Sequence, residues 1–503
     1  MKRFGLIFLG LGMLFVFGSC VSKKEVLKSD YQENWESLSA HKATPDWLYD
    51  AKFGIYFHWG IYTVPAFGSE WYPRFMFQEG TGNYAYHKEH FGDPAKFGYH
   101  DFIPLFKAEH FNADEWVDLF EKAGARFAGP CSEHCDGFSM WASKINPWNS
   151  MDMGPHCDVT GELKKALNKR NMKMIATFHH AWHLQSFNPD KPDQRDFDSS
   201  YYPFIEGMPT TSEDSLLKIF YGNVPLEEWA EKYWFGKLKE VIDAYEPDII
   251  WHDSALGRVP EKWRVKFCAY YINEMARRGK EAAIVRKGDI PVSMSIENYE
   301  KSRKTTGNDH PWMADETIST NSWSYVNDMV IRPSADLIHI LSDIVSKNGI
   351  LLLNISPKAD GTIPQDQRDV LLEMGTWLKK YGEAIYSTRP WYTYGEGPTK
   401  EPEGGFGDWE KFLKLKYTTD DIRYTTKDNT IYIIVQGNPE AGKQYNFSSF
   451  ASQNLPKAID IEKITLLGNK ENVTWKHTPD GLALTVPEHD IKDGSIVFKV
   501  EVN

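Results

Sequence analysis

Cysteine is scarce in this chain of 503 residues, which contains only five. Four of them, Cys131, Cys135, Cys157 and Cys268, follow the first twenty residues, and their spacing is too irregular for a disulfide framework. A small disulfide-rich secreted domain is therefore excluded. Cys131, Cys135, Cys157 and His156 could in principle gather a zinc ion, but no Cys-x-x-Cys pair supports it. We expect neither a metal site nor a cofactor.

Basic tracts are also absent. The chain has 57 Lys and Arg against 70 Asp and Glu, which gives a formal net charge of -13. Binding to a nucleic-acid backbone depends on clustered Lys and Arg. We therefore expect no nucleic-acid partner.

No hydrophobic run is long enough to span a membrane comfortably. The apolar run at residues 4–17 follows Lys2 and Arg3, an order typical of a signal peptide. Small residues then precede Cys20, as at a bacterial lipoprotein cleavage site, where the cysteine becomes the lipid-bearing first residue of the mature chain. An ordinary signal peptide with an incidental cysteine is the alternative.

We therefore predict a lipoprotein signal peptide at residues 1–20 and a tether at residues 21–44. The protein is expected to be exported to the cell envelope, as a periplasmic or outer-membrane lipoprotein. Its only membrane contact is expected to be the lipid on Cys20.

Strand and helix patterns alternate from about residue 45. Strands are expected at residues 52–57, 125–130, 173–178, 248–251, 290–296 and 350–355. Helices are expected at residues 112–124, 159–171, 227–245, 260–278, 334–347 and 365–381. This alternation requires a parallel sheet, and the number of units predicts a (β/α)8-like barrel at residues 45–389.

The pattern changes at about residue 390. Helical periodicity disappears, and short strands are expected at residues 430–436, 472–477, 482–486 and 495–502, between turn signals. We predict an antiparallel β-sandwich as a second domain, at residues 390–503.

Polar side chains follow the ends of several predicted barrel strands. The clearest case is Asp253, where the apolar run 248–251 ends abruptly; the others are His58, Glu133 with His134, His179 with His180, and Glu297 or Glu300. Since the C-terminal ends of barrel strands share one face, these groups predict a polar pocket there.

Aromatic residues make up 14% of the chain, and several flank these positions: Trp59, Trp71, Trp141, Trp251, Trp312 and Trp323. A flat aromatic wall beside His and carboxylate groups suits a sugar, which has an apolar C–H face and an edge of hydroxyls. Hydrolysis of a glycosidic bond requires two carboxylic groups. Asp253 and a Glu about 45 residues further on could supply them.

Six segments carry a family resemblance. They are K-F-G-I-Y-F-H-W-G at 52–60, S-E-W-Y at 69–72, E-H-C-D-G-F at 133–138, W-H-D at 251–253, N-S-W-S-Y at 321–325 and L-L-N-I-S-P-K-A-D-G-T-I-P at 352–364. In this order they resemble the signature segments of glycoside hydrolase family twenty-nine, the retaining α-L-fucosidases. The family's barrel and β-sandwich agree with the fold expected above.

The resemblance implies that Asp253 is the nucleophile of a retaining mechanism. It further implies a sugar pocket, to which the strand-end His179 is added, with these residues: His58, Glu70, Trp71, His134, Cys135, His179, Trp251, Arg286 and Trp323. Arg286 matches a basic residue near the acid/base. Cys135 departs from the family pattern, which has a second His there, and a thiol is a weaker hydrogen-bonding group. Cys135 could alternatively pair with Cys131 or Cys157.

The acid/base is assigned to Glu300, with Glu297 as the alternative. The two are three residues apart, so in an extended strand they face opposite sides and only one can enter the pocket. Asp315 and Glu316, expected in the loop before Trp323, are the next candidates.

The expected function is that of an exo-acting α-L-fucosidase that hydrolyses terminal α-L-fucosyl linkages in a fucosylated oligosaccharide or glycoconjugate. The alternative is a lipid-anchored carbohydrate-binding protein with a degenerate fucosidase pocket. Retention of Asp253 and of a Glu candidate favours the enzyme.

Overall fold

The computed structural model describes residues 27–28, 30–185, 200–307, 309–400, 402, 409–489 and 494–503. The expected signal peptide and Cys20 lie outside the described residues. Within the part of the chain that is described, no helix is both long enough and apolar enough to cross a membrane.

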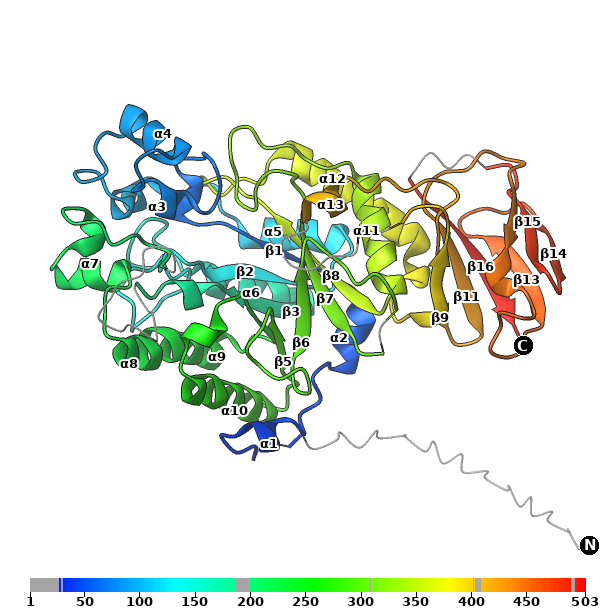
Figure 1. The fold of residues 1–503 in the computed structure, drawn as a ribbon, viewed down its shortest axis with the longest axis horizontal. Helices are drawn as coiled ribbons and strands as arrows, with labels where there is room; N and C mark the ends of the chain where they lie inside the picture. The colour runs from blue at the N-terminus through cyan, green and yellow to red at the C-terminus, as the bar shows by residue number, and fades with distance from the viewer. Residues whose placement is uncertain are drawn as a thin grey trace, which may run out of the picture.

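Eight parallel strands close into a barrel in chain order, and β1 pairs with both β2 and β8 (Figure 1). The strands are β1 Phe53–Phe57, β2 Phe127–Glu133, β3 Lys173–Phe178, β4 Ile249–His252, β5 Ala283–Arg286, β6 Ile296–Glu300, β7 Trp312–Thr317 and β8 Gly349–Ile355. The predicted (β/α)8-like barrel is confirmed.

Helices connect most of the barrel strands, and further helices precede β1 or follow β8. They are α1 Trp35–Leu38, α2 Asp46–Ala51, α3 Tyr72–Phe75, α4 Gly82–His90, α5 Ala113–Lys122, α6 Val159–Lys169, α7 Ser215–Phe220, α8 Leu226–Glu228, α9 Lys237–Tyr245, α10 Glu261–Arg277, α11 Ser334–Ser346, α12 Gln365–Tyr381 and α13 Trp409–Leu413. A π-helical stretch, η5 Trp229–Gly236, joins α8 to α9. Short 3-10 turns are η1 Ile61–Thr63, η2 Tyr99–Leu105, η3 His180–Trp182, η4 Pro209–Thr211, η6 Leu256–Arg258, η7 Gly382–Ala384 and η8 Ser448–Phe450.

The strand alternation separates two cores. Side chains such as Tyr56, Trp251 and Val285 fill the barrel interior, whereas their strand neighbours such as Phe57 and Ile250 pack outward under the helices. Every residue of β1, β2, β4, β5, β7 and β8 is buried, as expected for parallel strands covered on both faces.

The barrel is irregular between β5 and β7. Among the described residues of the connections β5–β6 and β6–β7 there is no helix. The strand expected at residues 290–296 is wrong, because most of that stretch forms turns and β6 starts only at Ile296. β7 was not predicted as a strand, and Asp315 and Glu316 lie in it rather than in a loop. Both strands contain carboxylates, so neither has the continuous apolar run that is typical of a buried strand.

The C-terminal region forms two antiparallel sheets. One has the order β13-β16-β11-β10-β9 and the other β12-β15-β14. The strands are β9 Arg389–Glu396, β10 Ile422–Lys427, β11 Thr430–Val435, β12 Gln444–Phe447, β13 Ile461–Leu466, β14 Thr474–Thr478, β15 Gly481–Thr485 and β16 Ile496–Val502. The larger sheet packs beside α11 (Figure 1). The predicted antiparallel C-terminal sheets are confirmed.

Part of the segment expected to be a tether and lead-in packs on the barrel. The backbone N–H of Tyr31 donates to Asn273 Oδ1 at 2.9 Å, and Asn273 Nδ2 donates back to the Tyr31 carbonyl at 2.8 Å. Leu38 of α1 is buried. The chain is therefore held against α10 well before β1.

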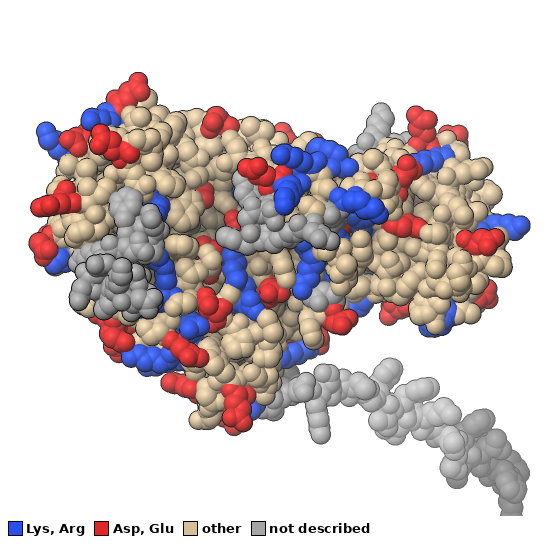
Figure 2. All heavy atoms as spheres, viewed as in Figure 1, with Lys and Arg blue, Asp and Glu red and all other residues tan. Residues whose placement is uncertain are grey.

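Acidic and basic side chains are interspersed on the face drawn in Figure 2. No broad basic surface appears there, which agrees with the negative net charge.

Candidate active site

A cavity of about 200 Å³ opens at the C-terminal ends of the barrel strands. Its wall is formed by Tyr56, His58, Glu70, Trp71, His134, His179, Trp182, Asp253, Ser254, Lys287, Glu300, Asp315 and Trp323. A larger hollow of about 600 Å³ beside α11 and α12 has no histidine on its wall. The cavity at the strand ends is the candidate site because it brings together the His and carboxylate residues expected there, and it lies below the roughly 300–1,000 Å³ of sites for drug-sized ligands.

Lys287 stands among three carboxylates of this cavity. Its Nζ lies 2.8 Å from Asp253 Oδ1, 2.7 Å from Glu300 Oε2 and 3.7 Å from Asp315 Oδ2. Since the first two distances share Nζ, the Asp253 and Glu300 oxygens are at most about 5.5 Å apart. Residues in or directly after β4, β5, β6 and β7 thus place four ionisable side chains close together.

This arrangement fixes the charge on Asp253. Burial alone raises the pKa of Asp253, but Lys287 and a hydrogen bond from His179 outweigh burial and hold that pKa well below its usual range. Burial likewise lowers the pKa of Lys287, yet the neighbouring carboxylates raise it well above its usual range. Asp253 is therefore a carboxylate at neutral pH.

Asp315 lies on the cavity floor and differs from Asp253. Burial raises its pKa, and Lys287 offsets this only in part. Asn298 Nδ2 donates to Asp315 Oδ1 at 2.5 Å, and the Tyr56 hydroxyl donates to Asp315 Oδ2 at 3.3 Å. These bonds hold Asp315 in place deep in the barrel.

The two Glu candidates face opposite sides of β6. Glu300 is on the cavity wall with a side chain that is 24% exposed. Glu297 is 39% exposed outside the cavity, where it accepts from the Tyr299 hydroxyl at 2.7 Å and lies 3.7 Å from Arg286 and from Lys304. The geometry therefore favours Glu300.

Three histidines line the opposite side of the cavity. His58 Nδ1 lies 2.8 Å from Asn354 Oδ1, which can only accept, so the proton is on Nδ1 and Nε2 keeps its lone pair. His179 Nδ1 lies 3.3 Å from Asp253 Oδ2. Burial lowers the pKa of His58 and of His134 well below the usual range, so both rings are neutral.

Several buried polar atoms of the cavity lack a partner within the described protein. They are Glu70 Oε2, His134 Nδ1 and His179 Nε2. Burial also raises the pKa of Glu70. Such atoms are costly unless a ligand satisfies them, and the hydroxyls of a sugar can do so.

Aromatic rings complete the wall. Trp71 and Trp182 meet edge to face with centroids 5.9 Å apart, and Trp323 lies 5.4 Å from the His58 ring. The Trp182 indole N–H donates to Ser254 Oγ at 3.2 Å. The cavity therefore combines apolar rings with polar groups, as sugar recognition requires.

Three of the expected sugar-pocket residues do not lie on the cavity wall. Trp251 is buried beneath it, with Lys287 Nζ 4.9 Å above its ring. Arg286 points to the other side of β5 from Lys287, and its Nε donates to Ser295 Oγ at 3.3 Å. Cys135 is fully buried, and its thiol donates to the His179 carbonyl at 3.4 Å.

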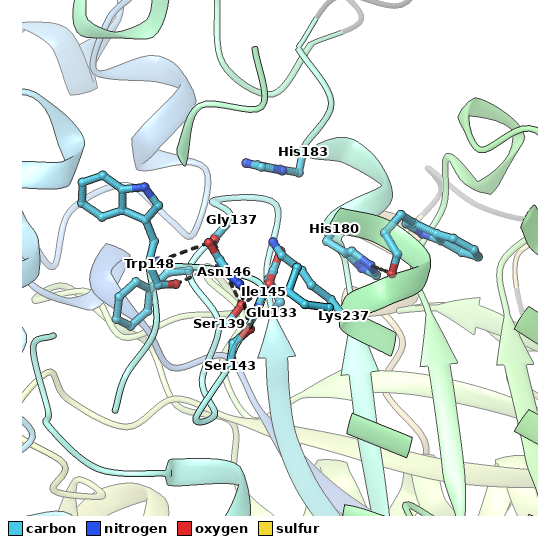
Figure 3. A network of polar contacts seen from close by, with 12 residues as sticks. Glu133, Gly137, Ser139, Ser143, Ile145, Asn146, Trp148, His180, His183 and Lys237 are labelled. Atoms are coloured by element: carbon cyan, nitrogen blue, oxygen red, sulfur yellow. Dashed lines mark hydrogen bonds and ion pairs between the residues drawn. The ribbon is translucent and has the colours of Figure 1, made fainter. Parts of the chain in front are cut away.

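A buried ion pair supports the segment that carries His134. Lys237 Nζ lies 2.6 Å from Glu133 Oε1, and Ser139 Oγ donates to Glu133 Oε2 at 2.6 Å (Figure 3). Asn146 Nδ2 donates to the Gly137 carbonyl at 2.9 Å and to Ser139 Oγ at 2.8 Å. The strand-end Glu133 is thus structural, and it anchors the turn after β2.

The cysteines form no cross-links in the described residues, where Cys131, Cys135, Cys157 and Cys268 are all free thiols. The pairing of Cys135 with Cys131 or Cys157 is therefore not present. Buried Cys135 packs behind the histidines instead.

Part of the cavity wall was not expected from the sequence, namely Tyr56, Trp182, Ser254 and Lys287, and Asp315 was expected only as a reserve candidate for the acid/base. One signal for Lys287 was available. Arg286 was expected to be the basic group, but the alternation of β5 places Val285 in the barrel interior, so the next inward residue is Lys287.

Known proteins resemble this chain over almost its whole length. The family model described as Alpha-L-fucosidase matches residues 19–383, and that described as Alpha-L-fucosidase C-terminal domain matches residues 416–500. Tissue alpha-L-fucosidase of Rattus norvegicus is 30% identical over 495 residues, covering 95% of this chain and 93% of the relative. That of Homo sapiens is 30% identical over 472 residues, covering 91% and 88%.

Solved structures agree with these matches. The Thermotoga maritima alpha-fucosidase in complex with a mechanism-based inhibitor superposes with a TM-score of 0.73 at 28% identity, covering 94% of this chain and 100% of the other. The same enzyme in complex with fucose gives a TM-score of 0.72 at 28% identity, with the same coverage. Since the family model covers more than half of the chain, the protein belongs to the α-L-fucosidase family.

Proposed function

We propose that the cavity binds one terminal α-L-fucosyl group and hydrolyses its glycosidic bond with retention of configuration. As a member of its family, the protein is an α-L-fucosidase, a glycoside hydrolase. One observation carries the mechanism. Asp253 Oδ1 and Glu300 Oε2 are at most about 5.5 Å apart, which agrees with the carboxyl separation of roughly 5–5.5 Å in retaining enzymes better than with the roughly 6.5–9.5 Å of inverting ones.

Each carboxyl group has a distinct role in this proposal. Asp253, held ionised by Lys287 and His179, attacks the anomeric carbon while Glu300 protonates the departing glycosidic oxygen. Glu300 then takes a proton from water, which attacks the same carbon and releases Asp253. When Asp253 is esterified, Lys287 keeps Glu300 and Asp315 as partners, which stabilises the Glu300 carboxylate needed for the second step.

The cavity shape supports exo action. A space of about 200 Å³ closed below by Tyr56 and Trp251 admits one small ring. Glu300 is more exposed than Asp253, with exposed side-chain fractions of 24% and 13%, so the leaving group faces the opening. A fucosylated oligosaccharide or glycoconjugate would thus enter by its terminal sugar.

The alternative of a non-catalytic binding protein is not favoured. Similarity to α-L-fucosidases extends over nearly the whole chain, and both carboxylates remain on the cavity wall. The unusual Cys135 packs against the His179 backbone and does not itself line the cavity, so it gives no reason to expect a lost activity.

The product stereochemistry tests the function. Purified protein is mixed with an aryl α-L-fucoside, and the released fucose is followed by proton NMR before it mutarotates. The α anomer is expected first. Initial release of the β anomer would overturn the retaining mechanism, and no release above the uncatalysed rate would overturn the enzymatic function.

We also propose that the protein is a lipoprotein of a bacterial cell envelope. The support is the order of Lys2, Arg3, the apolar run at residues 4–17 and Cys20. In a bacterial host that processes lipoproteins, the wild-type chain should fractionate with membranes, and Cys20→Ser should move to the soluble fraction. A Ser variant that stays with the membranes would refute the lipid anchor.

A further inference from the structure

The three histidines of the cavity form a compact cluster. His58 follows β1, His134 follows β2 and His179 follows β3, and one ring nitrogen from each lies within 4.8 Å of the other two. The ring centroids are 4.8 Å to 5.4 Å apart. The three imidazole rings, which follow neighbouring strands of the barrel, therefore lie close together.

Two of these rings are oriented by a second partner. Asn354 Oδ1 accepts from His58 Nδ1, and Asp253 Oδ2 lies 3.3 Å from His179 Nδ1. A carbonyl or carboxylate on the far nitrogen is the arrangement that orients metal-binding histidines. His134 Nδ1 and His179 Nε2 are buried without a partner in the described protein.

The charges around the cluster suit a cation. Four carboxyl groups, Glu70, Asp253, Glu300 and Asp315, share the cavity wall with a single lysine, Lys287. The excess of carboxyl groups lowers the electrostatic cost of bringing a divalent ion beside Lys287.

We propose that His58, His134 and His179 form a three-histidine binding site for Zn²⁺, and that the ion occupies the space of the sugar and so inhibits the enzyme. Three imidazoles with the fourth position open to the cavity match the ligand number of open zinc sites. Zinc–nitrogen bonds of about 2.0–2.1 Å place tetrahedral ligand nitrogens roughly 3.3 Å apart. The three ring nitrogens lie within 4.8 Å of one another, so the proposal requires the ion to draw the rings closer together. The expectation from sequence that no metal site exists is the one this proposal revises.

Cobalt absorption tests binding without using activity. The purified wild-type protein is titrated with Co²⁺, which gives strong visible bands when four-coordinate, and Zn²⁺ is then added. We expect such bands, and we expect Zn²⁺ to remove them. Their absence at saturating Co²⁺ would overturn the proposal.

Two ligand variants and one matched control locate the ion. His58→Gln and His179→Gln should each raise the Co²⁺ dissociation constant by at least about a hundredfold, as even an orienting partner contributes about 10–100-fold. His110→Gln, at an exposed position, should leave it unchanged. Bands that survive both ligand variants would overturn the site. Should a ligand variant unfold, displacement of the wild-type bands by L-fucose decides instead, and bands unaffected by saturating L-fucose would place the ion elsewhere.

Kinetics test the inhibitory part, which rests on the proposed function. Zn²⁺ should raise the KM for an aryl α-L-fucoside and leave kcat unchanged. A lowered kcat at saturating substrate would contradict competition in the cavity. A protein that binds Co²⁺ as described but hydrolyses no fucoside would refute the proposed function and leave the metal site standing.

Discussion

The protein buries two charge clusters of opposite sign, one in the cavity and one where the barrel meets the C-terminal sheet. In the cavity, one cation, Lys287, lies among three carboxylates, Asp253, Glu300 and Asp315. Two of these carboxylates keep partial access to solvent, with exposed side-chain fractions of 13% and 24%.

The second cluster has the opposite composition, with one carboxylate among three cations. One carboxylate, Asp343 of α11, lies 2.5 Å from Arg423 Nε, 3.0 Å from Lys347 Nζ and 3.3 Å from Arg303 Nε. Arg423 comes from β10 of the C-terminal sheet, and Arg303 follows Glu300 by three residues. All four side chains are almost completely buried.

Solvent access distinguishes the roles of the two clusters. A closed ion cluster is weak evidence for net stability, but removing one partner from it is costly. The Asp343 cluster thus fixes how the C-terminal sheet docks on the barrel, beside the segment after Glu300. The Lys287 cluster lies on the wall of the cavity, and there the same physics fixes the charge of Asp253, the proposed nucleophile.

The largest effect is expected from breaking the cavity cluster at Asp253. Asp253→Ala removes the nucleophile and should lower kcat on an aryl fucoside by at least about three orders of magnitude. Azide should restore turnover and give the β-fucosyl azide. Asp328→Asn, an exposed control, should keep wild-type kcat. Near-normal activity of Asp253→Ala would refute the assignment.

Disrupting the Asp343 cluster should lower the stability of the fold. Asp343→Ala removes a buried carboxylate that three buried cations share and should lower the free energy of unfolding by about 3–5 kcal/mol in urea titrations. Asp336→Ala, on the same helix, removes only a more exposed pair with Lys416 and should cost less than about 1 kcal/mol. Equal losses of stability in the two variants would show that the buried Asp343 cluster contributes no more than an exposed ion pair.

The third effect separates the two Glu residues of β6. Glu300→Ala should slow hydrolysis of a fucosylated oligosaccharide by about 10²–10⁴-fold and that of a nitrophenyl fucoside much less, because a weakly basic leaving group needs little protonation. Glu297→Ala should stay near wild type on both, since its side chain lies outside the cavity. The reverse result would reassign the acid/base to Glu297, and the same signature in Asp315→Asn alone would assign it to Asp315.

Removing the cation of the cavity cluster should shift the pH profile. Burial raises the pKa of Asp253, and Lys287 is the strongest group opposing this. In Lys287→Met the acidic limb of the kcat/KM profile should therefore move to higher pH, by about one to three units. Lys304→Met, whose lysine lies near Glu297, should leave the limb in place. An unshifted limb in Lys287→Met would show that His179 alone keeps Asp253 ionised.

The smallest effect is expected from a substitution at Cys135, which is buried next to His179. The family resemblance implies a His at position 135, but in this chain the Cys135 thiol is fully buried against the His179 carbonyl, so Cys135→His would not add a sugar contact. Inserting a larger ring should lower stability by about 1–3 kcal/mol through overpacking, measured in urea. The KM should not fall. A lower KM with unchanged stability would place Cys135 next to the sugar after all.

The sequence was most informative where local chemistry and chain order agree. The alternation of strands and helices predicted the barrel, and Asp253, His58, His134 and His179 were found because each follows a buried strand directly. The C-terminal ends of parallel barrel strands share one face, so position along the chain was enough to place these groups together.

Sequence patterns did not predict β6 and β7, two strands that contain cavity residues within them. β6 and β7 contain carboxylates that a helix or loop pattern explains equally well, and no helix among the described residues separates them from β5. The sequence could limit the acid/base to one of two Glu residues in an extended segment. It could not say which of the two faces the barrel interior, because that depends on the register of β6 with β5 and β7.

Residue patterns along the chain were enough to predict the barrel, the C-terminal sheets, the family and the place of Asp253 at a strand end. The tertiary structure alone decided that Lys287 rather than Arg286 enters the cavity, that Glu300 rather than Glu297 faces it, and that Cys135 lies behind it. The reason is physical. Strand ends are set by chain order, whereas the direction of a side chain depends on pairing between strands that lie far apart in the sequence.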